Sequence, residues 1–193
     1  MKSFAISGSP RENVGKRDAK ELRYLSQIPA VLYGGATQSH FSVSAADLKA
    51  VVYTPVVHFI DLDIAGVKSQ AIIKDIQFHP LTEQLLHVDF LLLDQDKPVT
   101  IEIPVKLTGT SPGVKMGGKL VQKLRKLRIK ALPKDHLDFI EVSIEGLEVG
   151  KSVRVSDLKL DNLYITNAKE DTIVSVTTSR ALRQAEQEAA GKK

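Results

Sequence analysis

The chain has 193 residues, of which 42% are hydrophobic, and its formal net charge is +4. This length can bury one sizeable core or two small ones. Cysteine is absent, which excludes disulfides and cysteine-based zinc sites. The first residues are too few and too polar for a signal peptide, and no apolar run approaches the about 20 residues that span a bilayer. We therefore expect a soluble, cytoplasmic protein without a membrane partner.

The first half of the chain alternates short strands with short helices. We expect a helix over 15–27 that Pro29 ends, and a second helix over 45–51 that Ser44 caps. Alternating apolar residues predict strands at 3–7, 30–33, 58–64, 67–78 and 85–92. Together these elements predict a small β-barrel, or curled sheet, with helices.

The helix over 15–27 carries a basic row. Residues at i, i+4 and i+7 align on a helix, so Lys16, Lys20 and Arg23 share one face. The adjacent face, which we expect to meet the core, holds Ala19, Leu22 and Leu25. The acidic residues Asp18 and Glu21 should project away from the basic row. The row can follow the phosphates of a nucleic acid, although an ordinary solvated helix face is the more frequent outcome.

The strand over 85–92 presents a polar pair. His87 and Asp89 share one face, while Val88 and Phe90 share the other, which should be buried. A histidine beside a carboxylate offers a donor and an acceptor suited to 2′-hydroxyls and base edges. The alternatives are a surface pair without function and a metal site that adds His79, which the long intervening segment disfavours.

A tyrosine ends another strand. Tyr33 stands directly before Gly34 and Gly35, where its ring can meet a base or sugar and its hydroxyl a phosphate. A rim tyrosine with a buried ring and a hydrated hydroxyl is an equally good interpretation.

The second half is rich in strands. Strict alternation at 99–107 and 127–131, with shorter apolar runs at 139–144, 153–155 and 173–176, predicts an all-β domain. The polar segment Asp94–Pro98 suggests a linker, so we expect domains at 1–94 and 95–179. The tail at 180–193 lacks an apolar stripe and should be disordered or a frayed helix. The expected fold class is mainly β with short helices, or α+β.

Residues 115–134 contain eight Lys and Arg and no acid. This run is either a second contact with a polyanion or a solvated strand face. Motifs of hydrolases, nucleotide-binding loops and zinc proteases are missing from the chain. We therefore expect no catalytic residue, no metal, no cofactor and no enzymatic activity.

Several segments carry a resemblance to a known family. Gly15-Lys16, Leu22-Arg23 and 28–34 resemble the N-terminal signature of bacterial large-subunit ribosomal protein twenty-five. The segments 75–80 and 87–90 are similar to its second signature. The second half resembles the extra β domain of the long form, the general stress protein Ctc type, at Gly117-Gly118, 132–135 and 150–158.

The resemblance implies an N-terminal barrel that binds 5S rRNA in the central protuberance of the large ribosomal subunit. It implies a protein that is monomeric when free, with 23S rRNA and neighbouring proteins as further partners through 115–134. By matching positions, the RNA contacts are Arg11, Lys16, Lys20, Arg23, Tyr33, Gln77, His87 and Asp89. The family often carries small and basic residues where Arg17, Asp18 and Glu21 stand here, which puts contacts at those three positions in doubt. The alternative function is a free, stress-induced protein that binds structured RNA with the same fold.

Overall fold

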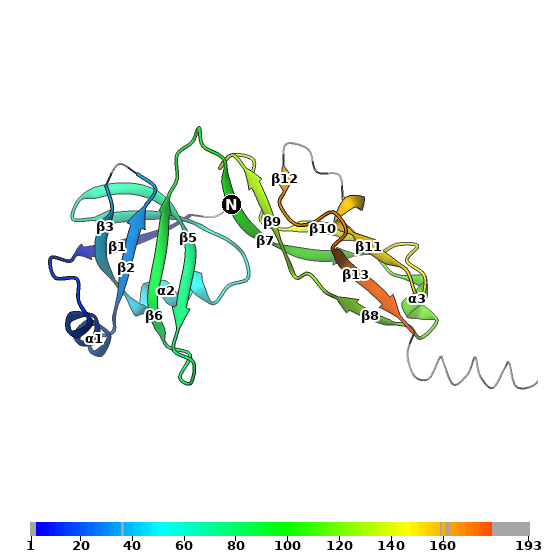
Figure 1. Cartoon of the computed structure of the whole chain (residues 1–193), viewed down its shortest axis with the longest axis horizontal. Coiled ribbons are helices and arrows are strands. Elements are labelled where there is room, and N and C mark those ends of the chain that lie inside the picture. Colours follow the sequence, from blue (N-terminus) through cyan, green and yellow to red (C-terminus); the bar gives the residue numbers. More distant parts are fainter. Residues whose placement is uncertain (1–2, 36, 159, 161–162, 179–193) are drawn as a thin grey trace, which may run out of the picture. The chain divides into compact units, whose positions relative to one another are not determined.

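The computed structural model describes residues 3–35, 37–158, 160 and 163–178, which form two compact units (Figure 1). The first unit holds the described residues up to Ile101 together with Leu132–His136, and the second holds Glu102–Ala131 and the described residues from Leu137 onward. The division between the units falls inside one strand, Val99–Thr108. The functional boundary at residue 94 stays a prediction, and the tail at 180–193 lies outside the described residues.

A closed barrel forms the first unit, as the alternation of its strands predicts. Its strand order is β1-β3-β2-β6-β5-β4, with parallel pairing of β1 with β4 and of β2 with β6. A closed barrel leaves no exposed sheet edge. The strands are β1 (Ser3–Pro10), β2 (Gln27–Tyr33), β3 (Ser39–Ser44), β4 (Phe59–Ile64), β5 (Val67–Phe78) and β6 (Leu85–Leu92).

The barrel interior is filled by the inward residues of each strand. On β6, Val88 and Phe90 are fully buried, which confirms the predicted faces of this strand. The ring of Phe90 lies 5.6 Å from that of Phe41 on β3. The hairpin of β4 and β5 turns where predicted, with Ile64 paired to Val67.

Two helices belong to this unit, α1 (Lys16–Tyr24) and α2 (Ala45–Val52). The predicted Ser44 cap is confirmed, because its Oγ accepts a hydrogen bond from the backbone N–H of Ala46 at 3.3 Å. Helix α1 ends earlier than predicted. Ser26 takes a left-handed φ of 58°, and the chain enters β2 at Gln27. Pro29 therefore lies inside a strand and does not end the helix.

The apolar face predicted for α1 is only partly correct. Ala19 and Leu22 are half-buried, but Leu25 is 73% exposed, and no residue of α1 is fully buried. The helix covers the outside of β2 without contributing to the barrel core.

The second unit is built from two sheets, which confirms the predicted all-β architecture. One sheet has the order β10-β7-β9-β12 and the other the order β11-β13-β8. The sequence analysis missed β3, and it also missed β8, β12 and α3, which have four residues or fewer. The elements are β7 (Val99–Thr108), α3 (Pro112–Lys115), β8 (Lys119–Gln122), β9 (Lys126–Ala131), β10 (Ile140–Ser143), β11 (Ser152–Arg154), the 3-10 turn η1 (Val155–Asp157), β12 (Tyr164–Ile165) and β13 (Thr172–Thr177). Among the described residues, no helix is long and apolar enough to cross a bilayer.

Candidate RNA interface

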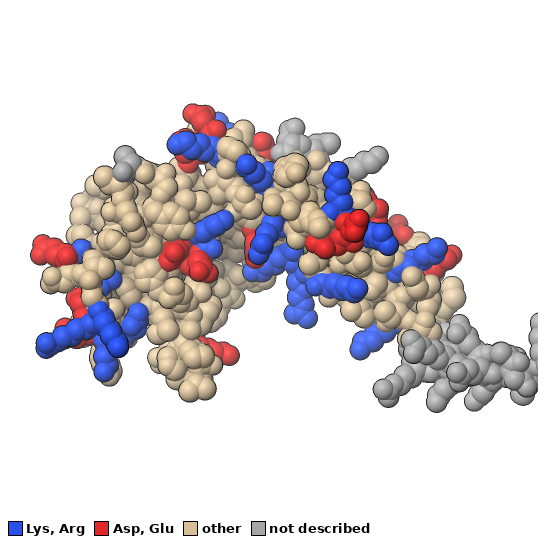
Figure 2. Space-filling model, in the orientation of Figure 1, with Lys and Arg blue, Asp and Glu red and all other residues tan. Residues whose placement is uncertain are grey.

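The cations of α1 stand on the outside of the barrel. Lys16 and Lys20 are exposed, and Arg23 is half-buried because its Nε donates a hydrogen bond to the carbonyl oxygen of Leu86 at 3.0 Å. This bond ties the helix to the start of β6. Figure 2 shows Lys and Arg side chains gathered around α1. The helix thus offers cations to a partner from a position fixed against the barrel.

Arg11 differs from the other predicted cations. Its guanidinium contacts Asp18 through Nη2 at 2.5 Å and Nε at 3.2 Å, and its side chain is only 9% exposed. The sequence did not predict this ion pair, in which Asp18 contacts Arg11 and not the basic row of Lys16, Lys20 and Arg23. Glu21 forms an exposed ion pair with Arg17 at 3.3 Å. Asp18 and Glu21 of α1 therefore partly neutralise Arg17 of the same helix and Arg11, which precedes it.

The polar residues of β5 and β6 meet through strand register. Gln77 pairs with His87, and Asp75 with Asp89, so these side chains lie side by side on the outer surface of the barrel. Nδ1 of His87 lies 2.8 Å from Oδ1 of Asp89, and both side chains are partly exposed. A carboxylate accepts from Nδ1–H, which in the neutral ring leaves Nε2 as a hydrogen-bond acceptor. The predicted pair of His87 and Asp89 is therefore present, and the hydrogen bond to Asp89 fixes the orientation of the His87 ring.

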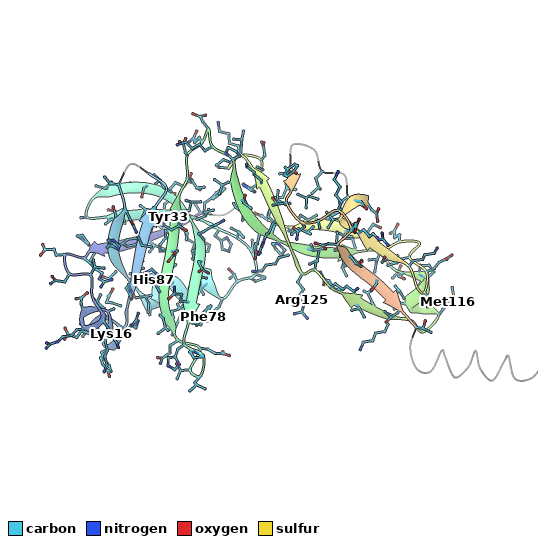
Figure 3. All side chains as sticks on the ribbon, viewed as in Figure 1. Lys16, Tyr33, Phe78, His87, Met116 and Arg125 are labelled. Atoms are coloured by element: carbon cyan, nitrogen blue, oxygen red, sulfur yellow. The ribbon has the colours of Figure 1, made fainter. Side chains whose placement is uncertain are left out.

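Tyr33 reaches the same acidic residues from β2. Burial, and then the negative charges of Asp89 and Asp75, raise the pKa of its hydroxyl above the usual tyrosine value. The hydroxyl of Tyr33 thus keeps its proton and can donate a hydrogen bond. Figure 3 labels Tyr33 and His87 on neighbouring strands of the barrel, with Lys16 on α1.

One groove collects most of these residues. Six of the eight predicted contacts line it, while Lys20 and Tyr33 lie outside its lining. The lining also includes Gln38 and His40, which sequence reasoning missed because β3 was not predicted. His40 pairs with Val31 on β2, and this register brings it to the groove. The full lining is Arg11, Val14, Gly15, Lys16, Ala19, Arg23, Pro29, Val31, Gln38, His40, Gln77, His87 and Asp89.

A metal does not fit this site. Nδ1 of His79 accepts hydrogen bonds from the backbone N–H groups of Leu81 and Thr82, at 3.3 and 3.2 Å. His79 thus caps the turn between β5 and β6. Within the described part of the chain, no group of three His, Cys, Asp or Glu residues could hold a metal ion.

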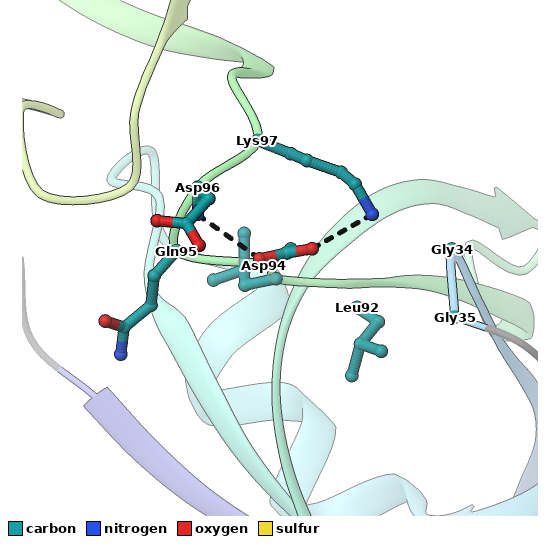
Figure 4. A pocket seen from close by; sticks show the side chains of 8 residues that line it. Gly34, Gly35, Leu92, Asp94, Gln95, Asp96 and Lys97 are labelled. Carbon is teal, nitrogen blue, oxygen red and sulfur yellow. Dashed lines mark hydrogen bonds and ion pairs between the residues drawn. The ribbon is translucent and has the colours of Figure 1, made fainter.

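A second hollow lies in the same unit, between Gly34-Gly35 and the segment 92–97 (Figure 4). Lys97 contacts Asp94 at 2.9 Å, and the backbone N–H of Asp96 donates to the same carboxylate at 3.2 Å. These two bonds, the one from Lys97 first, lower the pKa of Asp94. The polar groups of Asp94, Asp96 and Lys97 thus bond one another, and the segment forms an ordered turn after β6.

Comparison with known proteins agrees with this architecture. The sequence profile of the Ribosomal L25p family matches residues 6–90, and that of the ribosomal protein TL5 C-terminal domain matches residues 98–180. The chain is 48% identical to large ribosomal subunit protein bL25 of Cytophaga hutchinsonii, covering 100% of both chains. It is 45% identical to the protein of the same name from Amoebophilus asiaticus, covering 100% of this chain and 98% of that one. For the bL25 of Porphyromonas gingivalis the identity is 41%, with 96% and 97% covered. The chain therefore belongs to the ribosomal L25p family, whose members are structural proteins and not enzymes.

Proposed function

We propose that this protein is a component of the bacterial large ribosomal subunit, in the cytoplasm, and that it binds 5S rRNA in the central protuberance through residues 1–94. The relatives are named as large ribosomal subunit proteins. The observation that carries the RNA proposal is the groove between α1 and the barrel. It places cations along one wall and the His87–Asp89 pair with Gln77 along the other.

The two walls suit two parts of a structured RNA. Lys16 and Arg23 in the groove, with Lys20 beside it on α1, contact phosphates, which fix position but carry no sequence information. His87, Asp89 and Gln77 offer donors and acceptors on rigid strands, where they read 2′-hydroxyls and base edges of one particular groove shape. Tyr33 contributes a protonated hydroxyl beside them. Arg11 is the eighth contact, and in the free protein its charge is shared with Asp18.

The test is a titration of isolated 5S rRNA with the full chain and with the fragment 1–94. All six barrel strands end by Leu92, so the fragment retains the complete groove and should bind with nearly the same affinity. The Lys49→Gln variant removes an exposed cation from α2, outside the groove, and should bind as the parent does, so it is the control for a loss of positive charge. A fragment that is folded by circular dichroism yet binds about a hundredfold more weakly, or about 2.7 kcal/mol, would refute the assignment to 1–94.

Sedimentation separates the ribosomal role from that of a free RNA-binding protein. A subunit component should comigrate with the large subunit through a sucrose gradient in high salt. Release into the light fractions, together with intact 5S rRNA binding, would favour the free protein and contradict the ribosomal proposal.

A further inference from the structure

The outer face of the sheet β10-β7-β9-β12 concentrates cations. On β9, Leu127, Ile129 and Ala131 are buried, so Lys126, Arg128 and Lys130 alternate with them and point outward. Lys106 of β7 is exposed on the same side, where strand register sets it beside Glu141 of β10. We refer to Lys106, Lys126, Arg128, Lys130 and Tyr164 as the β9 face.

The structure divides the basic run at 115–134. Lys115 lies on α3 and Lys119 on β8, which belongs to the other sheet, while Lys134 belongs to the first unit. The run is therefore no single contact surface. Only the β9 part places successive cations on one flat face, about 6.6 Å apart along the strand.

Two aromatic rings flank these cations. Tyr164 on β12 pairs with Lys130 and is 70% exposed. Directly before β10, Phe139 is 41% exposed, and the Nζ of Lys106 lies 4.9 Å from its ring centroid. Arg128 forms an exposed ion pair with Glu102 at 2.9 Å, which leaves Lys126 and Lys130 without a carboxylate partner among the described contacts. An exposed ring next to unpaired cations is the combination that binds single-stranded nucleic acid.

We propose that the β9 face binds an unpaired segment of RNA, with Tyr164 stacking on a base and Lys126 and Lys130 contacting successive phosphates. A strand-borne ring cannot enter the deep, narrow major groove of an RNA duplex, and the bases beneath the shallow minor groove are already stacked on one another, whereas an unpaired segment offers splayed bases to the ring. The surplus of positive charge excludes a basic partner. This proposal rests on the second unit alone and stands independently of 5S rRNA binding by the first.

The absence of tryptophan gives a direct assay. Tyr164→Trp introduces a single indole into the full chain, and an oligouridylate of about ten nucleotides should quench its emission saturably as bases stack. The matched control is Tyr53→Trp, because Tyr53 is 59% exposed at the end of α2, outside both RNA surfaces. Its emission should stay unchanged. Absence of quenching in the Tyr164→Trp variant would overturn the proposal.

Charge variants give a second readout. Lys126→Gln with Lys130→Gln should make the slope of log K against log salt shallower by about 1.4, at 0.7 per phosphate contact on a single strand. Lys115→Gln with Lys119→Gln makes the same change in charge within the same basic run and should leave the slope unaltered. If the two double variants changed the slope equally, binding would depend on net charge alone, and the proposal of a defined binding face would be wrong.

The ring itself is tested by truncation. Tyr164→Ala should weaken oligouridylate binding about tenfold, while Tyr164→Phe, which keeps the stacking surface, should bind nearly as the parent does. Thermal melts control for folding, and the Tyr164→Phe comparison stands even if the alanine variant unfolds. If polyglutamate quenched the Tyr164→Trp variant as strongly as RNA does, the face would be a site for acidic proteins and the RNA proposal would be wrong.

Discussion

Replacing His87 and Lys20 separately distinguishes shape recognition from phosphate binding on the same unit. His87→Ala removes a ring that is 27% exposed and that shares a 2.8 Å hydrogen bond with Asp89. The change also leaves the carboxylate of Asp89 without its His87 partner, close to Asp75 and in the groove proposed to bind RNA. Loss of a hydrogen bond to a charged group and of its RNA contact should cost about 1–3 kcal/mol, or roughly 5- to 150-fold in affinity for 5S rRNA. Binding to an unrelated RNA duplex should change little.

Lys20→Gln should behave differently. Lys20 is exposed on α1 and makes no hydrogen bond or ion pair among those described, although its Nζ lies 5.9 Å from the Tyr24 ring. In the proposed function Lys20 contacts phosphate, so its loss should weaken binding to 5S rRNA and to the unrelated duplex by similar factors. The assay is a pair of titrations for each variant at one salt concentration, with Lys49→Gln as the control for lost positive charge.

Thermal melts decide whether the interpretation of His87 is correct. The side chains that fill the barrel from β6 are Val88 and Phe90, and neither variant touches them. The melting temperature should therefore shift little. A sharp fall in melting temperature with equal weakening of both RNAs would show that His87 is structural, and the argument from strand faces would fail.

Three further changes test other parts of the structure. With Arg11 neutralised by Asp18, the remaining three cations, Lys16, Lys20 and Arg23, should give a slope of log K against log salt of about −2 to −3 for 5S rRNA, and a slope beyond about −5 would show that further cations take part. Because the pKa of Tyr33 is raised on folding, its contribution to stability is fully present below pH about 10 and is lost as the pH rises through the folded pKa. The difference in tyrosinate absorbance between the parent and a Tyr33→Phe variant reports this titration and should appear above pH about 10. Its appearance below pH about 10 would contradict the raised pKa. Phe90→Ala empties the centre of the barrel and should lower the free energy of unfolding by about 3–5 kcal/mol in urea titrations, whereas a loss below about 1 kcal/mol would mean that the core collapses around the site.

Local periodicity was sufficient for much of the fold and for part of the site. Strict alternation located β7 and β9, and the rule that side chains alternate along a strand assigned the correct face to Val88 of β6. The same rule brought His87 and Asp89 together. Ser44 was identified as a cap because its side chain replaces a backbone partner at the start of a helix.

Contacts between distant segments could not be obtained this way. Asp18 meets Arg11 across a loop of irregular backbone, a contact that helix periodicity alone does not predict. His40 enters the groove through pairing of β3 with β2, a register that the short segment 39–44 does not specify alone. The basic run at 115–134 looked continuous in sequence, but strand connections distribute its cations over two sheets and two units.

The parallel pairings of the barrel impose an order on its folding during synthesis. Strand β1 pairs with β4, so Ser3 has no partner until Phe59 has been synthesised. Strand β2 pairs with β6, so Tyr33 has no partner on that strand until Leu91 has been synthesised. Strands that pair across long stretches of chain close late, because the loop entropy is lost before the contacts form. The barrel therefore cannot close until β6 has left the ribosome that is making it. The adjacent hairpins β4–β5 and β5–β6 are local and should nucleate first. A nascent chain halted before Leu92 would expose unpaired strand edges, and the groove lined by His87 and Asp89 would stay incomplete.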